Sequence, residues 1–346
     1  MAEKKDSILI LGSFIPGALA NQYVRGLKEN NWDIYCFEIQ EELNKIRQHS
    51  VLNKVIHRLH PAYYLRNLNR DVISEVKKIK PKVTLVFKGM ELFPGTLEEI
   101  KRHTSLLCNY NPDHPYKFYS RGTGNSFVLD GIKYYDLYFS YAKSVCTGLT
   151  NGFGVKSHCV PFGFDETLSP STFKKEDIKD KFIFVGAWDK ERESIFMKLT
   201  NYPVQIYGPK TWMSKNKKIS KNLYSGYAVY DKEYYDATFS AKGVFNFLRP
   251  QNIVEQSHNM RTFEIPGCGG LMITNRTKEQ SYFFEENKEA VYFDSMEELK
   301  DKLKFYQDND ALATTIKKNG LSRSLSSGYS YLNRSRELSV AIRKNL

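Results

Sequence analysis

The fold is decided by residues 258–274, which read HNMRTFEIPGCGG followed by LMIT. This stretch places an arginine, a glutamate and a glycine run between an expected helix and an expected buried strand. Arg261 carries a planar fork of donors that matches phosphate oxygens, and Glu264, one helical turn later, can accept hydrogen bonds from a ribose diol. The glycines leave room where backbone must approach another group closely. The order therefore predicts a phosphate and sugar site at the edge of an α/β sheet.

A plainer interpretation of the same residues stays open. In it, Glu264 lies at the start of a helix, Arg261 forms a salt bridge with it, and the glycines end the helix before the strand. The stretch taken alone favours this plainer interpretation, because short motifs often occur by chance. The rest of the chain is needed to choose between the two.

The bulk composition fits a globular protein of about two domains. The chain has 346 residues, of which 41% are hydrophobic and 26% charged, and domains usually contain about 100–200 residues. An excess of 51 Lys and Arg over 39 Asp and Glu gives a formal charge of +12. This charge favours anionic partners, namely nucleotides, nucleic acid or an acidic membrane surface, without choosing among them.

The cysteine pattern and the hydropathy pattern indicate a cytoplasmic protein. The five cysteines show no CxxC spacing, which argues against a disulfide scaffold or structural zinc and for a reducing compartment. No stretch reaches the ~18–20 apolar residues that span a bilayer, and the apolar run near the start is too short for a signal peptide. We expect a cytoplasmic protein, with peripheral contact to the inner face of the membrane left open.

The chain alternates apolar runs with helical stretches in two series. Strands are expected at 8–11, 33–39, 82–87, 105–109, 136–140 and 158–160, and then at 181–185, 204–207, 243–248 and 270–274. Helices are expected at 18–30, 71–79, 97–103, 191–199, 296–308 and 309–318, with broken helical pieces over 41–70. This alternation predicts parallel sheets with helices on both faces. We therefore expect an α/β protein with a first Rossmann-like lobe at 1–165, a linker at 166–180, a second lobe at 181–325, and a C-terminal helix at 326–346 that packs on the first lobe.

Two strand ends in the second lobe could meet a nucleotide. Gly186 follows the expected strand 181–185. A glycine turn before a helix can present N–H groups to a phosphate, with Lys190 or Arg192 adding charge. Tyr207 and Trp212 follow the next strand, where a base could rest against a ring. A plain turn and an ordinary packed aromatic are the alternatives.

The first lobe offers a candidate general base in residues 111–115, which read NPDHP. Two prolines stiffen this loop, and either Asp113 or His114 could take a proton from an acceptor hydroxyl. The alternative is a turn in which Asp113 caps the backbone. Lys88 lies at another strand end and could pair with Glu91 or neutralise charge at the site. We expect no metal site, because the spacing of His57 and His60 lacks an acidic or Cys partner.

These residues together resemble the C-terminal signature of the CgeB-like glycosyltransferases, the spore-maturation type related to family 1. The resemblance rests on NFLR at 246–249, on the stretch 258–270, and on FEENKE at 284–289, where Asn287 replaces a glycine of the family. It covers about residues 80–335 and is strongest over 243–300. The motifs around Lys88, Asp113, residues 161–165 and Arg192 also lie where the family has its motifs.

The resemblance implies a GT-B fold, in which two Rossmann-like lobes face an interdomain cleft and the C-terminal lobe holds the nucleotide-sugar. It implies that Glu264 binds the ribose hydroxyls and that Arg261 and Arg192 bind the diphosphate. The expected donor-binding set is Arg261, Glu264, Arg192, Gly186, Gly269, Gly270, Asn259 and Tyr207. The expected catalytic residues are Asp113 and His114, and the acceptor side is expected to include Lys88, Glu91 and Ser13. A related retaining family has a second glutamate where this chain has Gln256, so the retaining or inverting outcome stays open.

The predicted function is transfer of a sugar from a nucleotide diphosphate-sugar, with a UDP-sugar as the expected donor, in polysaccharide biosynthesis. No cofactor and no metal are expected, because arginines and backbone N–H groups can stabilise the departing diphosphate. The acceptor is a surface glycan, a lipid-linked glycan or a modified DNA base. The basic segment 45–78 is expected on the acceptor side. It could bind an anionic membrane, bind DNA, or have no partner. A catalytically inactive binding module and a nucleotide-sugar epimerase are the rival functions, and the sequence does not indicate an oligomeric state.

Overall fold

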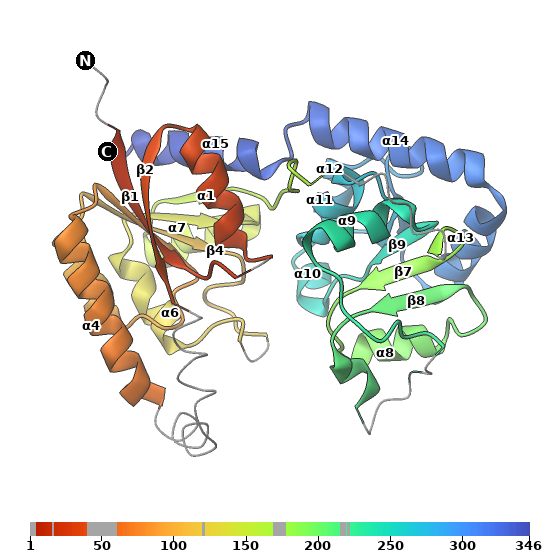
Figure 1. Cartoon of the computed structure of the whole chain (residues 1–346), viewed down its shortest axis with the longest axis horizontal. Coiled ribbons are helices and arrows are strands. Elements are labelled where there is room, and N and C mark those ends of the chain that lie inside the picture. The colour runs from red at the N-terminus through yellow and green to blue at the C-terminus, as the bar shows by residue number, and fades with distance from the viewer. Residues whose placement is uncertain are drawn as a thin grey trace. The chain divides into compact units, whose positions relative to one another are not determined.

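The computed structural model describes residues 5–15, 17–39, 61–119, 122–168, 178–214, 219 and 222–346. The chain divides into two compact units, Met1–Pro161 with Tyr331–Leu346, and Phe162–Ser330. Each unit contains one sheet with helices packed around it (Figure 1). All of the paired strands in the described residues run parallel, so the predicted α/β class is confirmed.

The first unit is built on a six-stranded sheet with the order β2-β1-β3-β4-β5-β6. Its central strands β3 and β4 are buried along their whole length, as expected for a sheet covered on both faces. The strands are β1 (Asp6–Gly12), β2 (Trp32–Glu38), β3 (Val83–Phe87), β4 (Leu106–Asn111), β5 (Leu137–Ser140) and β6 (Ser157–Cys159).

Crossover handedness decides which face each helix of the first unit covers. Every connection from β2 to β6 steps the same way along the sheet, and right-handed crossovers therefore place the intervening helices on one face. These helices are α4 (Pro61–Ile79), α5 (Pro94–Lys101), α6 (Ser126–Gly131), with the short η1 (Ile132–Tyr134), and α7 (Lys143–Phe153). The connection from β1 to β2 steps the other way, so α1 (Leu19–Glu29) lies on the opposite face.

The last helix of the chain, α15 (Tyr331–Arg343), packs beside α1 in the first unit (Figure 1). Gly26 of α1 approaches Ser335 so closely that an added Cβ would lie 2.3 Å from its Oγ. The indole Nε1 of Trp32 donates to Ser339 Oγ at 2.7 Å, and Leu338 and Ile342 are fully buried. The helix α15 thus completes the face that α1 alone would leave partly open.

The second unit is built on a five-stranded sheet with the order β11-β10-β9-β7-β8. Its strands are β7 (Phe182–Val185), β8 (Val204–Tyr207), β9 (Gly243–Asn246), β10 (Met272–Asn275) and β11 (Val291–Phe293). Its helices are α8 (Lys190–Met197), η3 (Lys210–Met213), α9 (Asp231–Ser240), α10 (Pro250–Val254), α11 (Arg261–Gly267), α12 (Lys278–Phe283), α13 (Met296–Asp308) and α14 (Asp310–Ser326).

The boundary between the units differs slightly from the expected one. Residues 162–165 belong to the second unit instead of the first lobe. The reason is that Phe164 N donates to Tyr329 O at 3.1 Å and its ring packs against Gly267, both within the second unit. Most of the expected linker, residues 169–177, lies outside the described residues.

One helix prediction was wrong. We expected helical pieces over 41–70 and a separate helix at 71–79, whereas α4 runs without a break from Pro61 to Ile79. Pro61 is the first residue of α4, a position where a proline gives up no helical hydrogen bond. Residues 41–60 of that prediction lie outside the described residues. None of the described helices is both long and apolar enough to cross a membrane.

Candidate functional site

The residues that follow the strands of the second unit gather at one edge of its sheet, because the strands are parallel. Ligands of such sheets bind beyond the carboxyl ends of the strands. At this edge lie Gly186 after β7, Gly208 after β8, Arg249 after β9 and Arg276 after β10. Of these residues, Gly186 belongs to the donor-binding set predicted from the sequence.

Arg261 and Glu264 form an ion pair at the beginning of α11. The Arg261 guanidinium lies over the ring of Tyr234 on α9, 4.0 Å from the ring centroid. Burial would lower the pKa of Arg261, but Glu264 and Tyr234 raise it above its ordinary value. The guanidinium stays charged, and both side chains keep some exposed surface, 34% for Arg261 and 13% for Glu264.

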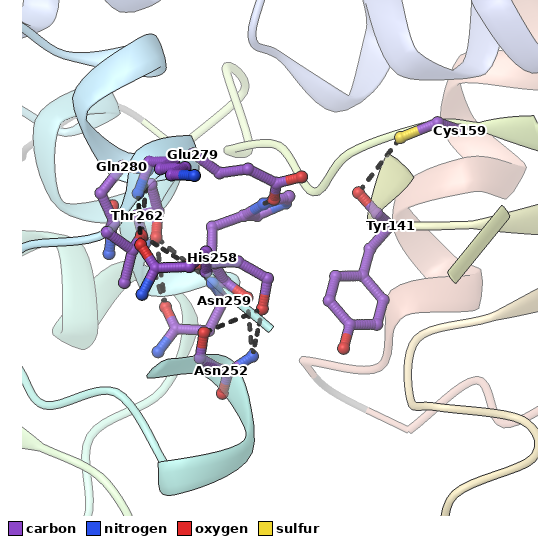
Figure 2. A network of polar contacts seen from close by, with 12 residues as sticks. Tyr141, Cys159, Asn252, His258, Asn259, Thr262, Glu279 and Gln280 are labelled. Atoms are coloured by element: carbon purple, nitrogen blue, oxygen red, sulfur yellow. Dashed lines mark hydrogen bonds and ion pairs between the residues drawn. The ribbon is translucent and has the colours of Figure 1, made fainter. Parts of the chain in front are cut away.

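A buried polar network holds the loop that leads into α11 (Figure 2). His258 Nδ1 lies 2.7 Å from Glu279 Oε2, and Asn252 Nδ2 donates to the His258 carbonyl at 3.0 Å. Asn259 Nδ2 donates to Asn246 Oδ1 on β9 at 2.8 Å, while its own Oδ1 accepts from Thr262 N. Asn259 thus ties α11 to the end of β9, which fixes where Arg261 and Glu264 stand.

All three guanidinium nitrogens of Arg192 contact oxygen atoms of the second unit. Its Nε lies 3.2 Å from Asp189 Oδ2, Nη1 donates to Ala187 O at 3.0 Å, and Nη2 donates to Phe247 O at 3.4 Å. The side chain is only 13% exposed. Burial lowers the pKa of Arg192, Asp189 opposes that effect, and the charges of Arg249 and Arg261 add to it. The contacts of Arg192 join the turn after β7 to the end of β9.

The glycines of the expected donor set are explained by packing inside the unit. The amide of Gly186 donates to Tyr207 O at 3.0 Å, so this N–H is already engaged. Gly269 has φ +79°, and its amide donates to Pro266 O, which ends α11. A Cβ on Gly270 would lie 2.6 Å from Thr238 Cγ2 on α9. The plainer interpretation of the stretch, an Arg–Glu pair followed by a glycine cap, describes this geometry.

The rings expected to support a base are buried. Tyr207 is 2% exposed and Trp212 is fully buried, with its Nε1 donating to Gly186 O at 2.9 Å. This burial leaves neither ring an open face for a ligand. Tyr227 lies at a 5.5 Å ring-centroid distance from Tyr207 and is 49% exposed. The exposed aromatic surface at the end of β8 therefore belongs to Tyr227.

In the first unit, Lys88 and Asp113 come together at the carboxyl ends of β3 and β4. Lys88 Nζ lies 2.7 Å from Asp113 Oδ2 and donates to Gly122 O at 2.5 Å. Lys88 has φ +66°, a backbone conformation that costs free energy in a residue other than glycine and is typical of functional sites. The carboxylate that contacts Lys88 is thus that of Asp113.

The remaining first-unit candidates lie near the same edge. His114 is 4% exposed, and its ring packs edge-on against Tyr116 at 4.3 Å. Ser13 follows β1, and its Oγ is buried with no hydrogen-bond partner among the described residues. The backbone oxygen of Glu91 accepts from Asn69 Nδ2 on α4 at 2.9 Å. The side chain of Asp113 is 30% exposed.

Of the basic segment 45–78, the structure describes residues 61–78. In α4, Lys77 pairs with Glu99 at 2.7 Å, Lys78 pairs with Glu75 at 3.2 Å, and Arg70 lies 3.8 Å from Asp71. His49, His57 and His60 lie outside the described residues. Over the described ranges, no group of three or more His, Cys, Asp or Glu side chains is arranged to hold a metal ion.

Tyr234, Arg249 and Arg276 lie at the second-unit edge or contact it, and none of them was predicted from the sequence as a site residue. Tyr234 lies on α9, 27 residues before Arg261 in the sequence, and its ring stacks on the Arg261 guanidinium. No local sequence pattern relates these two residues. Arg249 was noticed only as part of the NFLR motif, although it follows β9 at the same sheet edge. Its position after an expected strand was the signal that could have identified it.

Residues 187–339 match a protein-family model described as glycosyl transferase-like. The matched stretch begins just after β7, includes Arg192, Arg249 and α11, and ends in α15. A comparison with curated protein sequences gives no match. The family match supports a glycosyltransferase, and the narrower CgeB-like resemblance stays a prediction.

Solved structures of similar fold cover nearly the whole chain. Sucrose-phosphate synthase from Thermosynechococcus elongatus has a TM-score of 0.71 at 12% identity, over 98% of this chain and 99% of that chain. A glycosyltransferase from Rickettsia africae has a TM-score of 0.64 at 11% identity, over 99% of both chains. Anabaena HepE in complex with UDP-glucose has a TM-score of 0.63 at 12% identity, over 98% of this chain and 99% of that chain. These likenesses show that the chain has the GT-B fold.

Proposed function

We propose that this chain transfers a sugar from a nucleoside diphosphate-sugar, with a UDP-sugar as the donor, to a hydroxyl group of a glycan acceptor. The observation that carries the proposal is the Arg261–Glu264 pair at the start of α11, inside the stretch that matches the glycosyl transferase-like family. HepE, which has the same fold, binds UDP and UDP-glucose, and this supports the choice of donor.

The proposed donor contacts come from the second unit. Glu264 accepts hydrogen bonds from the ribose hydroxyls, and Arg261 faces the phosphates. When the bond between the anomeric carbon and the diphosphate breaks, negative charge grows on the diphosphate, and a positioned guanidinium stabilises that charge. The stacking of Arg261 on Tyr234 holds the guanidinium in place before the donor arrives.

The proposed acceptor contacts come from the first unit. The acceptor oxygen forms the new bond to the anomeric carbon and releases a proton. In an inverting reaction Asp113 takes this proton, and Lys88, 2.7 Å away, orients its carboxylate. In a retaining reaction the proton can leave with the diphosphate, and Asp113 then orients the acceptor.

The first test is a thermal-shift panel of UDP, GDP, dTDP, ADP and CMP, each with and without magnesium. A ligand at a hundredfold excess over its Kd stabilises the folded state by about 2.7 kcal/mol, so UDP should raise the melting temperature clearly. Glu264→Gln keeps the shape of the side chain and removes its charge, and it should weaken UDP binding by at least tenfold. The matched control is Glu297→Gln, an exposed glutamate on α13, which should bind UDP like the wild type.

Turnover separates the rival functions. A transferase consumes the UDP-sugar and labels an acceptor, whereas an epimerase converts the UDP-sugar to its isomer with no acceptor present. A binding module leaves the donor unchanged with glycan, lipid-linked glycan and DNA acceptors alike. The absence of any nucleotide-induced shift in the wild-type protein would refute the proposal at its first step.

A further inference from the structure

Four arginines lie at the carboxyl edge of the second-unit sheet. Three of them form ion pairs with carboxylates, namely Arg192 with Asp189, Arg261 with Glu264, and Arg276 with Glu286, Asp294 and Glu298. Arg192 is paired with Asp189 and donates its two remaining nitrogens to the Ala187 and Phe247 carbonyls. A ligand could use the Arg192 guanidinium only by breaking these contacts. Arg192 therefore serves to join the exits of β7 and β9.

Arg261 is matched by Glu264 and is held against the Tyr234 ring. Its remaining exposed surface allows a ligand contact, but its charge is balanced within the unit. Arg192 with Asp189 and Arg261 with Glu264 thus form two neutral pairs. An arginine without a carboxylate partner would therefore add to the attraction that Arg261 offers a diphosphate.

Arg249 differs from the other three arginines. Its side chain is exposed and makes no ion pair or hydrogen bond with any described residue. Arg249 follows β9, the neighbour of β7 in the sheet, and Arg192 Nη2 donates to Phe247 O, two residues before Arg249. The positive charge of Arg249 lowers the pKa of Arg192. Hydrogen bonds also hold the backbone around Arg249 in place. Leu248 N donates to Asn275 Oδ1 at 3.0 Å, and Asn252 N donates to Arg249 O at 2.9 Å.

From this arrangement we infer that Arg249 is a further diphosphate-binding arginine of the site, in addition to Arg261, and that Arg192 is a positioning residue. The inference rests on the proposed function, since it assigns the phosphate contact of the same donor site. A phosphate can accept two parallel hydrogen bonds from the planar guanidinium of Arg249 without displacing any protein contact.

The test measures binding of inorganic pyrophosphate, UDP and uridine by calorimetry to the full chain. Arg249→Ala should weaken pyrophosphate and UDP binding by at least tenfold and leave uridine binding unchanged. Arg249→Lys keeps the charge and loses the fork, so its affinity for UDP should fall between those of the wild type and Arg249→Ala. The matched control, Lys304→Ala, removes one exposed positive charge from α13 and should bind all three ligands like the wild type.

The outcomes separate this inference from the proposed function. If the wild type binds UDP and Arg249→Ala binds it equally well, the inference is overturned and the donor site stands. If the wild type binds neither UDP nor pyrophosphate, both are overturned. If Arg249→Ala and Lys304→Ala weaken binding equally, the effect comes from net charge alone, which also overturns the inference. An unchanged melting temperature of Arg249→Ala, expected for an exposed side chain, excludes misfolding as the cause.

Discussion

At the scale of single residues, Arg192 shows how a charged side chain at a sheet edge can belong to the scaffold. Its hydrogen bonds link the turn after β7, through Ala187 O, to the end of β9, through Phe247 O. The Phe247 contact spans 55 residues of sequence. No local sequence motif can reveal such a contact. The sequence shows only an arginine that follows a strand and a glycine turn, and this pattern suggested a phosphate ligand.

Arg192→Ala should destabilise the protein. Hydrogen bonds that involve a charged group contribute about 1.5–3 kcal/mol, so we expect a loss of about 2 kcal/mol in the free energy of unfolding, measured by urea denaturation. Lys190→Ala, which removes an exposed charge two residues earlier on the same helix, is the control and should change stability little. Equal stability of the two variants would contradict the scaffold role of Arg192.

The site was predictable to the extent that it depends on neighbours in sequence. Arg261 and Glu264 are three residues apart on a helix, and this spacing brings their side chains together. Tyr207 and Trp212 were chosen as aromatic residues after a strand, but sequence gives no sign of which aromatic ring is buried. Their burial depends on contacts such as Trp212 Nε1 to Gly186 O, across 26 residues.

At the scale of elements, the strands were the most predictable part of the fold. All ten predicted strands are present within two residues of their expected bounds, because buried parallel strands appear as short apolar runs. The missed strand, β11 (Val291–Phe293), has three residues and directly follows a charged segment. The extent of α4 was also missed, since a proline suits a helix start as well as a break.

The contact between α1 and α15 is tight enough to test by paired substitutions. A Cβ on Gly26 would lie 2.3 Å from Ser335 Oγ and 2.5 Å from Ser335 Cβ, so Gly26→Ala should destabilise the protein by about 1–3 kcal/mol. Ser335→Gly removes both atoms, and a glycine inside a helix costs about 1 kcal/mol. In the double variant the clash is absent, so its loss of stability should be smaller than the sum of the single losses.

The measurement is a double-mutant cycle by chemical denaturation. The control is Gly95→Ala on α5, where nothing lies within 4 Å of an added Cβ, and it should leave stability nearly unchanged. Additive effects of Gly26→Ala and Ser335→Gly would mean that α1 and α15 do not touch at these residues, since only contacting sites couple.

At the scale of the whole molecule, the two units differ in how the chain supplies them. The second unit is one unbroken segment, Phe162–Ser330, whereas the first needs both Met1–Pro161 and Tyr331–Leu346. The late segment is part of the first unit's core, where Tyr331, Leu338 and Ile342 are buried together with Tyr23 and Leu27. The first unit therefore lacks one side of its core until the end of the chain joins it.

This division sets an order of events during protein synthesis. Domains usually fold as units in the order in which they leave the ribosome, but here the unit that is begun first is completed last. On nascent chains stalled at increasing lengths, we expect protease resistance of the second unit before that of the first. Resistance of the first unit before residues 331–343 have emerged would contradict this order. Until α15 has been synthesised, the N-terminal half of the nascent chain exposes the apolar surface that α15 later covers. We therefore expect chaperones to bind this half.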